Sequence, residues 1–496
     1  MTSLLDETGT QIDTLRDAFD RQQSAFRQFA PLQYTQRVEA LDALLHGVLH
    51  YEDTFIKALK ADFGNRSSHE TRLLEMFPLV DEIRYVKRHL RRWMQPRAVA
   101  VNWQFLPSRA RIVYQPLGVV GIIGAWNYQL LLTLSPLANA LAAGNHVMIK
   151  PSELAPATAE AMQKMISGLF PAEYVTVITG GKEISAAFAS LPFDHLIFTG
   201  STRVGKLVMK AAAENLTPVT LELGGKSPAL VHESYPMSIA ADRICSAKFW
   251  NGGQTCVAPD YALVPSHRVR EFVQHAESVI SRRYPRLASN ADYTSMIHQS
   301  AWRRMQELVD DAANKGAVVV EINPAKDTFT AENRVFPPTL LLNTDGSMRI
   351  MQEEIFGPIL PVVSYSSLDD ALAFINARPR PLALYYFDRN DKRIDKVLKK
   401  TVSGGVTVND CIFHFPQHRL PFGGVGPSGM GAYHGRDGFE TSSKKKGVFL
   451  QNSLVGSFLD RVFKPPYNAW TDRMIALLMR RDKRHNMQRM SLAKEK

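Results

Sequence analysis

Val119-Val120-Gly121-Ile122-Ile123 is the first of four short apolar runs that decide how this chain folds. The runs Val147–Ile149, Val175–Thr179 and Leu196–Phe198 follow it, and a helix-length segment separates each run from the next. Apolar, β-branched runs that alternate with helices are typical of a parallel sheet with helices on its faces. Such sheets bind ligands at the carboxyl ends of their strands, so we expect the functional residues directly after these runs.

The segments on either side of these runs extend the same architecture. Apolar residues at helical spacing, such as Leu41, Leu44, Leu45 and Val48, predict helices in the N-terminal part of the chain. Short alternating stretches within Val101–Tyr114 predict a hairpin. Beyond Glu222, a second α/β domain is predicted by the strand-like runs Ala229–Val231, Ala262–Val264, Val318–Val320, Leu360–Tyr365, Ala383–Phe387 and Gly405–Val408.

Composition limits the class of protein. A chain of 496 residues exceeds what one hydrophobic core usually serves, and 45% hydrophobic with 22% charged residues is ordinary for a soluble globular protein. The three cysteines are too few for a disulfide framework, which favours a reducing compartment, and we expect a cytoplasmic protein. The N-terminus does not read as a signal peptide, and no stretch approaches the roughly 20 apolar residues that span a bilayer.

The net charge of +11 is concentrated near the C-terminus, where residues 461–496 hold ten Lys or Arg against three Asp or Glu. The body of the chain offers neither a basic face nor an aromatic platform in its sequence, so we expect no nucleic-acid partner. In the tail, Trp470, Met474, Leu477 and Leu478 share one helical face with Arg473, Arg480, Arg481, Lys483 and Arg484 nearby. A helix packed on the body or on a partner subunit is the favoured interpretation, and contact with an anionic membrane surface is the alternative.

A cysteine and a carboxylate carry the strongest chemical signal. Cys256 ends the stretch Asn251-Gly252-Gly253-Gln254-Thr255-Cys256, and Glu222 lies in Leu221-Glu222-Leu223-Gly224-Gly225-Lys226. A partly ionised thiol is the best side-chain nucleophile at neutral pH, and a nearby carboxylate can take a proton from water. The pair therefore indicates covalent catalysis through a thioester that is later hydrolysed.

Polar residues follow the first two strand runs. Asn127 can donate a hydrogen bond to a developing oxyanion, or it can cap the next helix. Lys150 and Glu153 can bind the hydroxyls of a ribose, or the segment Ser152-Glu153 can begin a helix. An acidic residue on an adenosine ribose disfavours a 2′-phosphate, which favours NAD over NADP.

The segment Thr199–Leu207 resembles two phosphate loops but matches neither. A Walker loop requires Ser or Thr where Leu207 stands, and the spacing of a third glycine in the dinucleotide fingerprint is absent. A glycine turn that leads into a helix N-terminus remains, and it favours an anionic phosphate.

The other thiols and histidines suggest no further site. Cys245 and Cys411 are expected to be buried core thiols. His414 and His418 have metal-like spacing, but Pro416 between them prevents a regular helix from presenting both, so we expect no metal site.

Taken in order, these segments resemble the aldehyde dehydrogenase superfamily over the chain up to about Lys446. Cys256–Tyr261, Leu420–Gly426 and Tyr433-His434-Gly435 are similar to its class-three-like branch, to which bacterial coniferyl-aldehyde dehydrogenases belong. The resemblance implies an α/β fold with a Rossmann-like parallel-sheet cofactor domain, a second α/β catalytic domain and a small β oligomerisation arm. It places the NAD-binding domain in residues 1–98 and 118–221, the catalytic domain in 222–408, the arm in 99–117 and 409–450, and a basic amphipathic tail in 451–496.

The resemblance also implies residue roles. Cys256 would be the nucleophile, Glu222 the general base, and Asn127 with the Cys256 backbone N–H the oxyanion hole. Lys150 and Glu153 would hold the adenosine ribose. Glu354 would bind the nicotinamide ribose and Phe356 would contact the nicotinamide ring. The residues beneath the pyrophosphate would be Gly200, Ser201, Thr202, Arg203, Val204 and Gly205.

The implied activity is oxidation of an aldehyde to the carboxylic acid with NAD, or with NADP as the alternative cofactor, in a homodimer. Two substrate classes stay open: aromatic aldehydes of the coniferyl type and medium- or long-chain aliphatic aldehydes. An acylating enzyme that uses coenzyme A and a catalytically silent NAD-binding scaffold are the competing interpretations. Glu222 argues against the first, because a built-in base favours water, and the intact Cys256, Glu222 and Asn127 set argues against the second.

Three positions depart from the family pattern. Ala125 and Gln129 stand where the family usually has proline on both sides of Trp-Asn-Tyr, which predicts a looser loop around Asn127 and a polar group at the substrate entrance. Ser442 replaces an aromatic residue of the branch.

Overall fold

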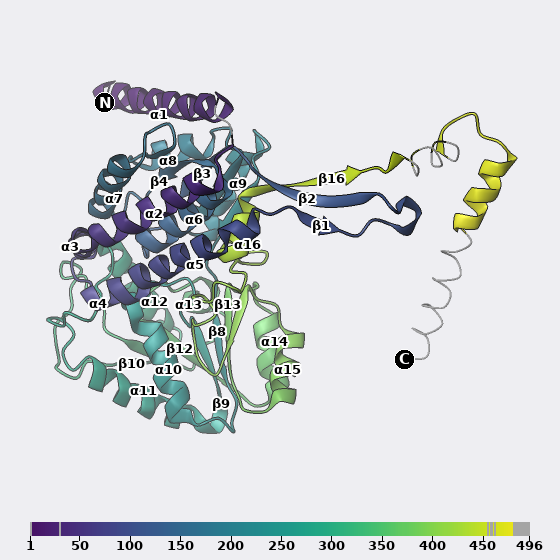
Figure 1. Ribbon diagram of the computed structural model, residues 1–496. Coiled ribbons are helices and arrows are strands. Elements are labelled where there is room, and N and C mark those ends of the chain that lie inside the picture. The colour runs from purple at the N-terminus through teal and green to yellow at the C-terminus, as the bar shows by residue number, and fades with distance from the viewer. Residues whose placement is uncertain (1, 29–30, 454–455, 457–459, 461–462, 480–496) are drawn as a thin grey trace. The chain divides into compact units, whose positions relative to one another are not determined.

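The computed structural model describes residues 2–28, 31–453, 456, 460 and 463–479. The chain divides into two units, one of residues 1–93 with 116–444 and one of residues 94–115 with 445–496. The larger unit holds two sheets that helices cover, and the smaller unit holds a three-stranded sheet and the C-terminal segment (Figure 1). The domain boundaries expected from the sequence stay a prediction.

A six-stranded sheet with the order β15-β7-β6-β3-β4-β5 carries the first half of the larger unit. Five of its strands are parallel, and β15 pairs antiparallel with β7. All four expected runs are strands, although β5 ends at Val177 rather than Thr179, and β7 and β15 were not predicted. The strands are β3 (Val119–Ile123), β4 (His146–Lys150), β5 (Val175–Val177), β6 (His195–Thr199), β7 (Val219–Glu222) and β15 (Gly429–Met430).

The strands β3, β4 and β6 are buried along their whole length, which explains their β-branched composition. Among the helices, α6 (Gln129–Ala143) is also buried at every position, so its sequence is apolar nearly all round. The predicted N-terminal helices are confirmed. The helices of this half are α1 (Thr2–Gln28), α2 (Tyr34–His50), α3 (Glu52–Phe63), α4 (Ser68–Glu70), α5 (Phe77–Trp93), α6, α7 (Pro156–Leu169), α8 (Lys182–Ala189) and α9 (Thr202–Ala213), with a π-helix η1 (Thr71–Met76) between α4 and α5.

The second sheet confirms the predicted second α/β region. Its order is β10-β11-β12-β9-β8-β13-β14, parallel except for the edge pair β10–β11. The strands are β8 (Pro228–Val231), β9 (Tyr261–Pro265), β10 (Val318–Glu321), β11 (Thr339–Leu342), β12 (Ile359–Tyr365), β13 (Ala383–Phe387) and β14 (Gly405–Val408). The helical segments are α10 (Met237–Phe249), η3 (Trp250–Gly253), η4 (Ser266–Arg268), α11 (Val269–Arg283), α12 (Gln299–Asn314), α13 (Arg349–Gln352), α14 (Leu368–Asn376) and α15 (Asp391–Lys400). The last helix of the larger unit, α16 (Gly435–Thr441), packs on α5 and α6 of the first half.

The smaller unit contains a hairpin, but its first strand lies before the predicted range Val101–Tyr114 and only its second strand falls largely within it. β1 (Arg97–Val99) pairs antiparallel with β2 (Arg109–Pro116), and β16 (Ser443–Leu450) lies on the other side of β2. A 3-10 turn, η2 (Trp103–Phe105), lies in the hairpin loop. In the tail, residues 469–479 are helical and Trp470 and Leu477 are exposed. The predicted basic residues from Arg480 onward lie outside the described part of the chain.

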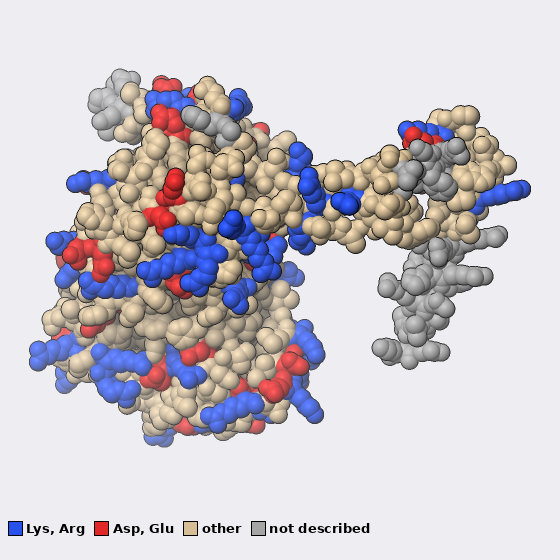
Figure 2. Space-filling model, viewed as in Figure 1, with Lys and Arg blue, Asp and Glu red and all other residues tan. Residues whose placement is uncertain are grey.

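Basic side chains also gather on the larger unit. Arg84, Arg88, Arg91 and Arg92 are exposed on α5, and Lys and Arg side chains cluster over this helix (Figure 2). The tail is therefore not the only basic region of the chain.

Cys245 and Cys411 are buried, as predicted. Among the described residues no helix has the length and apolar character that crossing a membrane requires, and no three His, Cys, Asp or Glu converge as metal ligands would.

A buried ion pair links β9 to the segment that carries Glu354. Lys226 lies against the carboxylate of Asp260, and both side chains are almost fully buried. The Lys226 ammonium also donates to the carbonyls of Ile350 at 2.7 Å and Glu353 at 3.0 Å. The second Asp260 oxygen accepts the Ile355 N–H at 3.0 Å. The pair thus fixes both ends of the segment around Glu354.

Replacing Asp260 with Ala should lower the free energy of unfolding by about 3–5 kcal/mol, because Lys226 would be left as an uncompensated buried charge. Chemical denaturation followed by circular dichroism measures this change. Asp395→Ala is the matched control, since Asp395 and Lys399 form an exposed pair at 4.0 Å. The control should change stability by less than about 0.5 kcal/mol. Equal small effects in the two variants would contradict the role given to Asp260.

Candidate active site

The carboxyl ends of four neighbouring strands bring the predicted site residues to one edge of the six-stranded sheet. β7 ends at Glu222, β6 at Thr199, β3 at Ile123 and β4 at Lys150, and these strands are parallel neighbours in this order. Asn127 follows β3 and Glu153 follows β4, while the segment from Gly200 follows β6. This edge is where an open α/β sheet binds its ligands.

The loop that presents Cys256 is built from left-handed backbone. Asn251, Gly252 and Gly253 have φ values of 54°, 59° and 76°. A side chain at Gly253 would place its Cβ 2.3 Å from the Gly357 carbonyl oxygen, so only glycine fits there. The loop therefore packs directly on the segment that carries Glu354 and Phe356.

The side chain of Asn127 binds the loop that carries Cys256. Its Nδ2 donates to the Gln254 carbonyl oxygen at 3.1 Å, and the side chain is buried. The residue that precedes α6 is Tyr128, which makes no side-chain cap, so the helix-cap interpretation of Asn127 is wrong. Tyr128 instead bonds through its hydroxyl to the Thr255 hydroxyl at 2.7 Å. Two successive side chains after β3 thus contact the residues directly before Cys256.

The acid groups of the site all resist ionisation. Glu222 is buried, neither of its carboxyl oxygens has a hydrogen-bond partner in the described part of the chain, and burial raises its pKa well above the ordinary value. Burial, with the Glu354 and Glu222 carboxylates nearby, raises the pKa of the Cys256 thiol to about 12. Burial and Asp260 raise the pKa of Glu354 to about 8. The thiol and both carboxyls therefore share one electrostatic environment.

Lys150 and Glu153 lie together at the end of β4. The Lys150 Nζ lies 3.8 Å from a Glu153 carboxylate oxygen and donates to the Pro151 carbonyl at 2.7 Å. Burial lowers the pKa of Lys150, and the Glu153 carboxylate opposes this shift. The alternative interpretation, in which Ser152 and Glu153 begin the helix, is wrong: α7 begins at Pro156, where a proline favours the first helical position.

The segment after β6 forms the predicted turn into a helix. Ser201 precedes α9, and its side chain accepts the Val204 N–H at 3.4 Å. The Gly200 N–H donates to the Glu222 carbonyl at 3.0 Å, which joins this turn to the end of β7. A Cβ at Gly205 would lie 2.7 Å from the Leu223 side chain, so α9 approaches the β7 loop closely. Thr202 and Arg203 form the first turn of α9, where backbone N–H groups have no helical partner.

Glu354 and Phe356 lie near the β7 loop and the β3 loop. A Cβ at Gly224 would fall 2.1 Å from a Glu354 carboxyl oxygen, so the glycine leaves room for that carboxyl group. The Phe356 ring packs edge-on against Trp126, with 5.3 Å between ring centroids. The Phe356 backbone is left-handed, with φ of 53°. The predicted site residues thus lie at strand ends, in the loops that follow them and in the start of α9, and in the loops of Cys256 and Glu354 that pack beside this sheet edge.

Sequence reasoning missed three charged residues beneath the Asn127 loop. Arg66 donates to the Asn127 carbonyl at 2.9 Å, and it pairs with Glu75 at 2.8 Å. Glu70 accepts the Asn251 N–H at 3.1 Å and the Thr294 hydroxyl at 2.7 Å. Arg66 lies between α3 and α4, Glu70 lies in α4 and Glu75 in η1, and charged residues in such a segment are usually solvent-exposed. Only their burial distinguishes these three, and the sequence does not reveal it.

Gln129 is not a polar group at a substrate entrance, as the sequence suggested. The side chain is fully buried, and its Nε2 donates to the Ala155 carbonyl at 3.1 Å. It therefore links the start of α6 to the residue before α7. Ser442, the third departure from the family pattern, is also buried.

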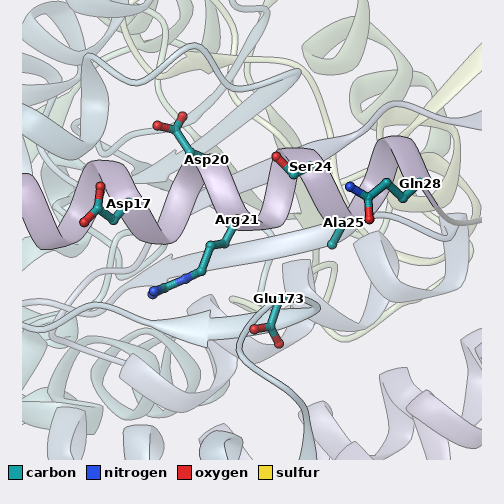
Figure 3. Close-up of a pocket in the computed structure, with 7 residues that line it drawn as sticks. All are labelled: Asp17, Asp20, Arg21, Ser24, Ala25, Gln28 and Glu173. Carbon is teal, nitrogen blue, oxygen red and sulfur yellow. The ribbon is translucent and has the colours of Figure 1, made fainter.

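A surface hollow of about 550 Å³ lies elsewhere on the larger unit, along α1 (Figure 3). Its lining residues are Asp17, Asp20, Arg21, Ser24, Ala25, Gln28 and Glu173. None of them is a residue of the candidate site.

The sequence and the fold of this chain are similar to those of known proteins. Residues 7–448 match the model of the aldehyde dehydrogenase family. A probable coniferyl aldehyde dehydrogenase of Pseudomonas aeruginosa is 48% identical, over 95% of this chain and 97% of that protein. Aldehyde dehydrogenase family 3 member A2 of the mouse is 39% identical, over 92% and 91%. The substrate-bound structure of AldH from Staphylococcus aureus is 36% identical, covers 94% of this chain and 99% of its own, and superimposes with a TM-score of 0.88.

The predicted resemblance to the class-three-like branch is thereby confirmed. The family match and the fold match both extend over nearly the whole length of the chain. This chain belongs to the aldehyde dehydrogenase family, whose members oxidise aldehydes to carboxylic acids with NAD or NADP.

Proposed function

We propose that the chain carries out this oxidation with Cys256 as nucleophile, Glu222 as general base and Asn127 as oxyanion donor. One observation carries the proposal: the Asn127 amide is bonded to the loop of Cys256, and the buried carboxyl of Glu222, which has no hydrogen-bond partner among the described residues, helps to raise the pKa of the same thiol. A buried carboxyl without a partner is costly, and such groups are commonly kept for catalysis.

The residues around the sheet edge fit a dinucleotide. Lys150 and Glu153 offer a cation and a carboxylate for the adenosine ribose, and the N-terminus of α9 offers backbone N–H groups for the pyrophosphate. The Glu354 carboxyl, which Gly224 accommodates, would hold the second ribose, and Phe356 would contact the nicotinamide. We propose NAD as the preferred cofactor, because Glu153 would repel a 2′-phosphate. Bound NAD supplies the acceptor for the hydride that leaves the substrate.

The chain's own residues would act in two stages. The Cys256 thiol gives its proton to solvent, and the resulting thiolate adds to the aldehyde carbon. The Asn127 amide with the Cys256 N–H donates to the oxyanion. An amide carries two N–H donors, so Asn127 can bind the Gln254 carbonyl and the oxyanion together. After the hydride leaves, Cys256 holds the acyl group as a thioester. Glu222 then takes a proton from water, and the hydroxide releases the carboxylic acid and the thiol.

Cys256→Ala should abolish NADH formation with every aldehyde tested, because no other thiol lies in the candidate site. NADH absorbance measures the rate. Cys245→Ala is the matched control, since Cys245 is a buried core thiol of α10, and it should retain turnover. Intact-protein mass spectrometry of quenched wild-type enzyme should find the acyl group on Cys256. Turnover by the Cys256 variant, or an acyl group elsewhere, would refute the assignment.

The raised pKa of Glu222 predicts a pH dependence of the second stage. A carboxyl with a raised pKa gains its base form at higher pH than an ordinary glutamate, so the fraction of Glu222 that can act as a base grows as the pH increases. The steady-state rate should therefore keep rising with pH beyond the range in which an ordinary glutamate titrates. Glu222→Gln should keep a rapid NADH burst of up to one equivalent per subunit. Its later steady rate should fall by roughly 10²–10⁴-fold and lose the rise attributed to Glu222. Stopped-flow absorbance across pH separates the two stages, and loss of the burst itself would contradict the role of Glu222.

We propose an aromatic aldehyde of the coniferyl type as the preferred substrate. The name of the Pseudomonas aeruginosa relative supports this choice. Trp126, next to Asn127 and partly exposed, would pack well on a planar ring. Steady-state kinetics with coniferyl aldehyde and with medium- and long-chain aliphatic aldehydes, each with NAD and NADP, tests the proposal. A higher kcat/KM for the aromatic substrate with NAD is expected, and a clear preference for an aliphatic chain would contradict it.

We further propose a cytoplasmic homodimer that uses the β1–β2–β16 sheet as its contact arm. Trp103, Leu106 and Phe449 of this unit expose much of their apolar surface, which an interface would bury. Multi-angle light scattering measures the mass of the particle in solution and so the number of subunits. A monomer at micromolar protein concentration would contradict the proposed contact role of the β1–β2–β16 sheet.

A further inference from the structure

Arg66 and Glu75 form an ion pair beneath the loop that carries Asn127. The Arg66 Nη2 lies 2.8 Å from a Glu75 carboxylate oxygen, and neither side chain has any exposed surface. Burying two charges is unfavourable unless further hydrogen bonds satisfy both groups. The other partners of this pair are therefore informative.

Both partners bind backbone groups at or just after Asn127. Arg66 Nη1 donates to the Asn127 carbonyl at 2.9 Å. Glu75 accepts the N–H groups of Leu130 at 2.8 Å and Leu131 at 3.4 Å, in the first turn of α6. A carboxylate at a helix N-terminus is also favoured by the helix dipole. The pair thus holds the Asn127 carbonyl and the first turn of α6, which is the α6 end of the segment between β3 and α6.

Aromatic contacts and an unusual helix fix the pair itself. The Arg66 guanidinium lies 4.7 Å from the Phe63 ring centroid and 5.2 Å from that of Tyr128. Glu75 lies in the π-helix η1, a wider helical turn that proteins often keep at functional positions. Neither ring contact of Arg66 involves Cys256 or Glu222. The ion pair and its ring contacts therefore support the loop of Asn127 rather than the nucleophile or the base.

The same segment lacks a restraint that its family usually has. Ala125 and Gln129 stand where proline normally fixes the backbone on both sides of Trp-Asn-Tyr. We infer that Arg66 and Glu75 are positioning residues that hold Asn127 in place of those prolines. The inference rests on the proposed role of Asn127 as oxyanion donor. It adds two residues that touch no substrate but set the geometry of one that does.

Arg66→Met keeps the length of the side chain and removes its charge and donors. The expected result is a roughly 10- to 100-fold lower kcat with little change in the KM for NAD, because only the oxyanion donor is displaced. The effect should be much smaller in an Asn127→Ala background, since a positioning residue can act only through the residue it positions. Steady-state kinetics of the wild type, both single variants and the double variant measures this coupling.

Two further variants separate positioning from general stability. Arg37→Met is the matched control: Arg37 is also buried, but it donates to the carbonyls of Ala142 and Ala143 at the opposite end of α6. It should lower the melting temperature and leave kcat close to that of the wild type. Gln129→Pro restores a proline at the first position of α6, where proline is well tolerated, and should recover part of the kcat that Arg66→Met loses.

The outcomes distinguish the positioning role of Arg66 and Glu75 from the proposed role of Asn127 as oxyanion donor. An equal loss from Arg66→Met in the presence and absence of Asn127 would overturn the positioning role and leave Asn127 catalytic. Unchanged kcat in Asn127→Ala alone would overturn the proposed oxyanion site and this inference with it. If Arg66→Met does not fold, Arg66→Lys keeps the charge but not the planar fork that reaches two partners. Its smaller loss of kcat should also vanish without Asn127, and persistence of that loss would refute the inference.

Discussion

The hydrogen bond from the Asn127 amide, in the first sheet's loop, to the Gln254 carbonyl, in the second region's loop, aligns the two halves of the candidate site, and the Tyr128–Thr255 hydroxyl contact lies beside it. Asn251 reinforces it by donating to both the Asn127 and the Gln254 carbonyls at 3.1 Å. Gln254 in turn donates to the Asn251 and Ser295 carbonyls. Because these amide side chains bind backbone carbonyls, they fix the path of the chain rather than the position of one side chain. The thiol and the oxyanion donor can then be aligned only if both regions pack correctly.

The parts of the site that the sequence predicts are those that depend on local order along the chain. Strand runs such as β3 carry β-branched residues because both faces are buried, and the functional residues follow the strand ends for topological reasons. The same reasoning missed β11, a short run directly after Pro337 and Pro338. It also missed Arg66 and Glu75, whose backbone partners at Asn127 and Leu130 lie more than 50 positions away. Their role depends on tertiary burial, which helical periodicity does not encode.

Desolvation governs the electrostatics of the site. The Cys256 thiol, Glu222 and Glu354 all have pKa values raised chiefly by burial, and each carboxylate makes ionisation of the thiol harder. Burial also lowers the pKa of the neighbouring Lys248 to about 8, although Asp260 opposes that shift. Because ionisation of either carboxyl makes ionisation of the thiol harder, a sequence in which the three acids carry charge in turn is favoured. A mechanism in which the thiolate acts first and the carboxylate only after acylation meets this constraint, because the thioester that separates the two stages has no charge.

An ion pair and a proline restrain a loop in physically different ways. Proline restricts the unfolded chain as well as the folded one, so its restraint needs no partner. The Arg66–Glu75 pair acts only when the segment from α3 to η1 has packed against α6 and excluded water from both charges. In this chain the geometry of Asn127 is therefore conditional on the N-terminal helices. It follows that these helices, which contribute none of the proposed reacting groups, belong to the active site as much as the loops they support.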